Sequence, residues 1–105
     1  DLMQTQTSKE HPVIFARSIT VSKNRPAKLR IQAGGPAGQP WQLAVRVNDR
    51  VLMTARLDDK APLRLGQYDI DLAPFAGQTV WLQVAHDAIG AVPATAYWKQ
   101  LELVD

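Results

Sequence analysis

Apolar and polar residues alternate with a period of two along most of this chain. Between Trp41 and Val47, for example, every second residue is large and apolar. This alternation is typical of β-strands with one buried face, and no helical period of 3.6 residues lasts for more than about two turns. The pattern predicts strands over residues 14–21, 28–33, 41–48, 51–57, 67–72, 80–85 and 97–103. The first of these is one strand or two short ones, so the total is seven or eight.

Turn-forming residues separate these segments. Asn48 and Asp49 tolerate a positive φ, so they predict a tight hairpin turn before Val51. We expect Gly77 to supply a positive φ between two later strands, because side chains with a Cβ adopt it only at a cost. Phe75 is expected to fill the space under this turn, and the Asp71 carboxylate to accept backbone N–H groups within it.

Short strands spaced by roughly ten residues predict an all-β fold, a sandwich or a barrel. We expect a two-sheet antiparallel β-sandwich of seven to eight strands over residues 11–105, and a flexible polar connector over residues 1–10. The length of 105 residues fits one domain. A chain of this size buries roughly 60–70% of its unfolded surface, so it can form a core without metals or disulfides.

Composition excludes several classes of protein. The chain has no Cys, which excludes disulfide scaffolds, thiol nucleophiles and Fe–S clusters. No apolar run approaches the roughly 18–20 residues of a membrane span, and no signal peptide is recognisable, so no membrane partner is expected. The chain begins Asp1-Leu2-Met3, and we therefore expect it to be cut from a longer precursor.

Charge is unevenly distributed, although the net formal charge is only +2. The segment 12–48 holds six basic residues and no acid: Arg17, Lys23, Arg25, Lys28, Arg30 and Arg46. This pattern fits a solvated strand face or a surface for polyanions. Nucleic-acid modules usually add interleaved aromatics or a groove-binding helix. Neither accompanies this segment, so nucleic acid is not an expected partner.

Residues 41–52, 68–84 and 96–103 carry recognisable motifs. The second reads YDIDLAPFAGQTVWLQV and the third AYWKQLEL. They resemble the galactose-binding-like jelly-roll modules that accompany secreted bacterial glycosidases and related enzymes. The resemblance implies a jelly roll, a carbohydrate-binding accessory role and an extracytoplasmic location (periplasmic, cell-surface or secreted) in a larger bacterial protein. Many relatives have an Asp-Asn pair where this chain has Lys99-Gln100, so the family's metal or sugar contacts at those positions are not carried over by the resemblance.

The candidate binding residues centre on two tryptophans. By strand parity, Trp81 and Trp98 point away from the core, whereas Trp41 shares the parity of core residues. Lys99 is the one polar residue on the apolar side of its strand. If their strands are neighbours, the two indoles form a flat platform for a pyranose ring. Gln83, Gln100 and Glu102 would then bind the hydroxyls. The alternative is that another segment or domain covers both indoles.

A second candidate site lies at one end of the sandwich, where galactose-binding-like modules often bind sugars. It comprises the loops 34–40 and 87–95, with His86 and Asp87 at a strand end. His86 is also explained as a hydrogen-bonded histidine of the fold. No metal or cofactor is expected; the only plausible anchors for a structural Ca²⁺ are Asp58, Asp59 and Asp87.

Catalysis has little support in the sequence. Only three serines occur, at positions 8, 18 and 22, and none lies in a strand-to-helix elbow. Two carboxylates flanking a deep cleft are not recognisable either. We therefore expect no enzyme, but a non-catalytic carbohydrate-binding module whose partner is a glycan. The alternative is a structural module that packs against a neighbouring domain and binds no ligand.

Overall fold

The computed structural model of the chain describes residues 3–7, 11–25, 27–36, 38–57, 65–89 and 93–104. Within them it contains eight strands and one short 3-10 helix, η1 (Ala73–Phe75). The strands are β1 (Met3–Gln6), β2 (Val13–Thr20), β3 (Lys28–Gly34), β4 (Trp41–Val47), β5 (Arg50–Leu57), β6 (Gly66–Asp71), β7 (Thr79–Ala88) and β8 (Thr95–Val104).

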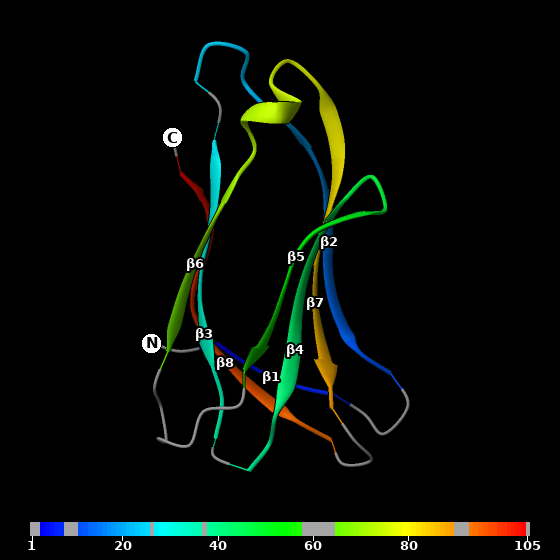
Figure 1. The fold of residues 1–105 in the computed structure, drawn as a ribbon, viewed down its shortest axis with the longest axis vertical. Coiled ribbons are helices and arrows are strands. Elements are labelled where there is room, and N and C mark those ends of the chain that lie inside the picture. The colour runs from blue at the N-terminus through cyan, green and yellow to red at the C-terminus, as the bar shows by residue number, and fades with distance from the viewer. Residues whose placement is uncertain are drawn as a thin grey trace.

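The strands form two antiparallel sheets that face each other, with orders β1-β8-β3-β6 and β2-β7-β4-β5 (Figure 1). The first four strands pair with the last four in reverse order, as in a long hairpin that folds over itself. The pairs are β1 with β8, β2 with β7, β3 with β6, and β4 with β5. Eight strands connected in this way form a jelly roll. The prediction of an all-β, two-sheet antiparallel sandwich is confirmed.

The core lies between the sheets and consists of the inward-facing residues of both. Ile31 from one sheet and Leu43 and Val45 from the other are fully buried. Trp41 is fully buried as well, as its parity predicts, and its Nε1–H donates to the carbonyl of Gly34 at 3.3 Å. A buried indole needs such an acceptor, because an unpaired polar group in the core costs free energy.

The turns have the conformations that their residues predict. Asn48 and Asp49 have φ values of 49° and 67°, and Gly77 has a φ of 80°. The Asp71 carboxylate accepts the backbone N–H of Ala73 at 2.9 Å. Phe75 packs partly buried against the core. These four roles are therefore structural, and none of them requires a ligand.

The N-terminal segment differs from the expectation of a flexible connector. Met3–Gln6 forms β1, which pairs with Thr95–Trp98 of β8. Thr7 is buried and exchanges hydrogen bonds with Ala94, since its backbone N–H donates to the Ala94 carbonyl and its Oγ1 accepts the Ala94 N–H. Residues 3–7 thus belong to the sandwich.

Candidate functional site

The two tryptophans proposed as a platform lie in different sheets and different environments. Trp98 on β8 is only 2% exposed, whereas Trp81 on β7 is 45% exposed. The expectation that Trp98 points outward is wrong because β8 contains a bulge: Gln32 of β3 pairs with Gln100, and the next residue, Ala33, pairs with Trp98. Lys99 is the extra residue, and it shifts the alternation by one position. The two indoles therefore form no common platform.

Trp81 lies on the outer face of the β2-β7-β4-β5 sheet, as its parity predicts. It is held rigidly at the backbone, since its N–H donates to Asn48 Oδ1 and its carbonyl accepts the Asn48 N–H, both at 2.9 Å. Ser18 of β2 is its direct cross-strand neighbour. An exposed indole beside a small side chain and a turn has its ring face open to a ligand.

Gln83 follows Trp81 on the same face of β7. It is opposite Ala16 on β2 and Arg46 on β4. Its Oε1 is buried and has no hydrogen-bond partner among the described residues. An unpaired buried acceptor costs free energy, and a ligand donor could reach it only after the Gln83 side chain turned outward. Trp81, Gln83 and Arg46 form what we call the outer patch: one exposed indole, one amide and one guanidinium.

Gln100 and Glu102 lie on the other sheet and are already hydrogen-bonded to each other. They belong to rows of polar residues that cross β6, β3 and β8, such as Gln67-Gln32-Gln100. In the next row Arg30 binds Asp69 through two hydrogen bonds, and this contact lowers the pKa of Asp69 and raises that of Arg30. This face is polar and internally paired, and it does not join the outer patch.

His86 is fully buried beneath the end of the sandwich, in a cluster of aromatic rings. Its ring lies 4.6 Å from that of Trp41, and the Trp41 ring lies 5.4 Å from that of Trp98. Trp98 Nε1–H donates to Thr5 Oγ1 at 2.8 Å, and Thr5 Oγ1 lies 3.0 Å from His86 Nδ1. The Thr5 hydroxyl accepts from the indole and lies within hydrogen-bond distance of Nδ1, so it links the Trp98 and His86 rings. We call this set of four residues the aromatic cluster.

Burial keeps the His86 ring neutral and lowers its pKa to about 4, although the backbone of Ala94 and the charge of Asp87 act in the opposite direction. The Thr5–His86 pair has the arrangement of a nucleophile and a base. However, no carboxylate orients Nε2, which has no hydrogen-bond partner among the described residues, and the ring has no exposure to substrate. The aromatic cluster therefore joins the two sheets and the N-terminal strand, and is not accessible to a ligand.

The loops at this end of the sandwich do meet. The backbone N–H of Thr95 donates to Gln39 Oε1 at 2.9 Å, and that of Ile89 donates to the Pro40 carbonyl at 3.3 Å. A Cβ at Gly35 would lie 2.7 Å from the Thr95 carbonyl, so the loops touch without leaving room for a side chain. Asp87 is exposed on the outer face, opposite Gln42 of β4.

No group of three or more acidic or histidine side chains that could hold a metal ion occurs within the described ranges. Asp58 and Asp59, the other candidate calcium anchors, lie outside the described residues. The basic residues of segment 12–48 do not form one surface, since Lys28 and Arg30 are on β3, Arg46 is on β4 and Arg17 is on β2. No helix long and apolar enough to cross a membrane is present in the described part of the chain.

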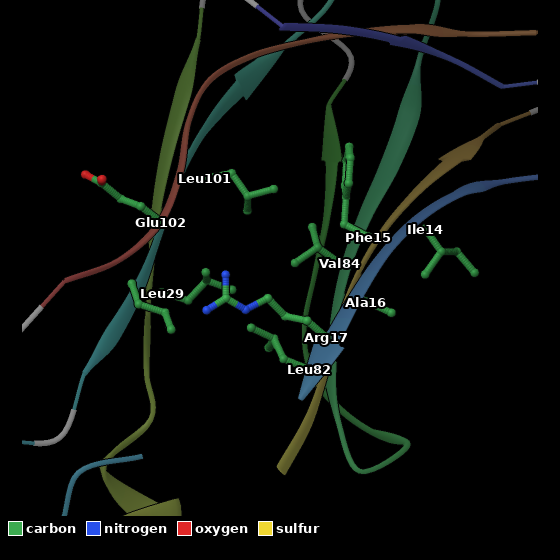
Figure 2. A pocket seen from close by; sticks show the side chains of 10 residues that line it. Ile14, Phe15, Ala16, Arg17, Leu29, Leu82, Val84, Leu101 and Glu102 are labelled. Carbon is green, nitrogen blue, oxygen red and sulfur yellow. The ribbon is translucent and has the colours of Figure 1, made fainter. Parts of the chain in front are cut away.

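A groove that strand patterning does not reveal opens between the sheets at the edge formed by β2 and β8 (Figure 2). Its volume is about 450 Å³. Six apolar residues that belong to the inward faces line it: Phe15, Leu29, Leu82, Val84, Leu101 and Leu103. Arg17 occupies an inward position of β2, and its side chain reaches into the gap between the sheets, whereas Glu102 points away from it. We call this the flank groove.

Comparison with known proteins adds no assignment to this geometry, because the chain matches no protein-family model and no curated protein sequence.

Proposed function

We propose that this domain is a non-catalytic carbohydrate-binding module of the galactose-binding-like kind, which binds a glycan on the outer patch. The observation that carries the proposal is the exposed ring of Trp81 on a sheet face, next to Gln83 and Arg46. The C–H face of a pyranose stacks on an indole, and the surrounding hydroxyls need donors and acceptors such as a guanidinium and an amide.

A single indole on an open face gives weak affinity. Tethering to a catalytic domain, in an extracytoplasmic protein of a bacterium, would increase the effective concentration of the glycan without new contacts. The aromatic cluster offers no accessible catalytic group, which is in line with an accessory role.

A glycan array on this domain, followed by titration of tryptophan fluorescence, tests the proposal. At least one oligosaccharide should bind, and Trp81→Ala should abolish binding. Ile14→Thr is a matched control, because Ile14 is exposed on the same face but lies opposite Ala85, four residues along the sheet from Trp81. Retention of binding by Trp81→Ala, or an array without any signal, would contradict the proposal.

The alternative function, packing against a neighbouring domain, has a specific observation in its favour. Ile14 and Val51 are exposed on the same face as Trp81, with Ala16, Ala44 and Ala85 among them. A face of this composition also suits a protein partner. Under this alternative, Ile14→Thr and Trp81→Ala would weaken association with the adjoining domain equally, and no glycan would bind.

A further inference from the structure

The flank groove is a gap in the core with one charge in it. Leu29 and Leu101 point into the gap from one sheet, and Val84 points into it from the other, while the side chains of Ile14 and Ala16 point away (Figure 2). Among the described residues, β1 pairs with β8 from Thr95 to Trp98. No strand pairs with the rest of β8 on that side among the described residues.

Among the described residues that line the gap, Arg17 is the only charged one whose side chain points into it. No ion pair or hydrogen bond joins its guanidinium to another described residue. A guanidinium stays charged under all ordinary conditions and binds carboxylates through two parallel hydrogen bonds. By itself, an inward charge on an edge strand is also a device against edge-to-edge association. The apolar volume beside it, however, is far larger than that role requires.

We propose that the flank groove binds a free acyl carboxylate, with its hydrocarbon chain between the sheets and its carboxylate on Arg17. The volume of about 450 Å³ lies within the range of small-molecule sites, which are mostly apolar with a few polar groups that orient the ligand. Apart from Arg17, the inward-facing side chains that line the groove within the described part of the chain are all apolar. The occupant is therefore apolar along its length and anionic at one end, whereas a peptide would bring backbone N–H and carbonyl groups into the gap.

Titration of the chain with decanoate, followed by the NMR methyl signals of Leu29, Leu82 and Leu103, tests this site. Decanoate should shift these signals saturably, while the Trp81 indole signal stays unchanged. Nonyltrimethylammonium has the same alkyl chain as decanoate with a positive charge in place of the carboxylate, and it should bind about tenfold more weakly, because it meets Arg17 without a counter-charge. Octanoate should bind roughly tenfold more weakly than decanoate, because it buries two fewer methylenes.

Charge variants decide the role of Arg17. Arg17→Gln should remove the preference for the anion, and Arg17→Glu should reverse it. Arg46→Gln, a matched change on the outer face, should leave the preference intact. The proposal is overturned if the anion and the cation bind equally to the native chain, or if Arg17→Gln binds decanoate as tightly as the native chain does.

Two further outcomes would also overturn it. In one, only vesicles of anionic phospholipid bind and free decanoate does not, which would indicate attraction to a surface. In the other, the methyl signals stay fixed while a peptide protects the backbone amides of residues 99–104 from exchange, which would indicate strand addition at the β8 edge.

Discussion

The edge of the sandwich formed by β2 and β8 has two stretches that differ sharply. In one, β1 lies beside β8 and Thr5 connects Trp98 of one sheet to His86 of the other. In the other, beyond Trp98, Arg17 reaches into an open groove between leucines. The same two sheets enclose both stretches, and among the described residues β1 pairs with β8 in the first stretch only. We call the first the closed stretch and the second the open stretch.

The comparison shows how two stretches of one edge differ in what fills the space between the sheets. Where a short polar strand covers the edge, aromatic side chains fill the space between the sheets and their polar atoms are largely paired. In the other stretch, apolar side chains line the groove next to Arg17, whose guanidinium has no partner among the described residues. The closed stretch holds the sheets together, and the open one is where we propose that a ligand binds.

The largest effect is expected from Trp98→Ala. Trp98 packs against Trp41 and edge-on against Phe15, whose ring centre is 5.5 Å away, so its loss leaves a cavity in the closed stretch. We expect the free energy of unfolding to fall by about 3–5 kcal/mol, measured by urea denaturation. The matched change on the outer face, Trp81→Ala, should lower it by less, about 1 kcal/mol, because much of this indole is already in water. Equal effects would contradict the different burial of the two indoles.

The second effect is a pH dependence that belongs to the closed stretch. The pKa of His86 is lowered from 6.5 to about 4 by burial, so the unfolded chain binds a proton that the folded chain rejects between these values. The free energy of unfolding is therefore unaffected by His86 protonation above pH 6.5, and it decreases as the pH falls from 6.5 to about 4. The total decrease is about 3 kcal/mol, from the shift in pKa.

Urea denaturation at a series of pH values, with His86→Gln as the reference, isolates this contribution from those of the carboxylates. The difference in unfolding free energy between the native chain and the variant should shrink as the pH falls from 7 to about 4. A difference that stays constant with pH would show that the His86 ring is not buried in the neutral form.

A smaller effect should follow from Thr5→Ala. This change removes the acceptor for Trp98 Nε1–H and the hydroxyl partner of His86 Nδ1, and leaves both without that partner. We expect a loss of about 2 kcal/mol and faster exchange of the β1 amides with solvent. Thr5→Ser keeps the hydroxyl and should recover most of this stability. If serine and alanine behave alike, the hydroxyl does not connect the sheets.

The smallest effect concerns the open stretch. Arg17→Leu places an apolar side chain in the flank groove, and we expect a gain of about 1 kcal/mol in the free energy of unfolding. The loss of the inward charge should also increase self-association, measured by sedimentation. A lower free energy of unfolding for Arg17→Leu would contradict this account. It would show that Arg17 stabilises the fold and that the groove does not accept an apolar side chain.

Much of the fold could be predicted because seven strands have one apolar and one polar face. β1 could not, since its sequence Met-Gln-Thr-Gln has no apolar alternation. Such a short edge strand is held by backbone pairing with β8 and by the Thr5 hydroxyl, and neither leaves a period in the sequence.

The candidate site was harder to predict, because it depends on the strand register and on how the two sheets bring distant residues together. Parity placed Trp81 correctly but failed for Trp98, where the bulge at Lys99 reverses the faces of β8. The signal was present: a lysine on the apolar side of an otherwise regular strand is the mark of an extra residue. The flank groove has no such signal, since Arg17 and the leucines that surround it are far apart in the sequence.

Hydrogen exchange at the three indole N–H groups, followed by NMR on the native chain, tests the central claim that β1 closes one stretch of the edge. The N–H of Trp98 should exchange orders of magnitude more slowly than that of Trp81, and about as slowly as that of Trp41, because Thr5 holds it in the interior. Exchange of the Trp98 indole as fast as that of Trp81 would contradict the account.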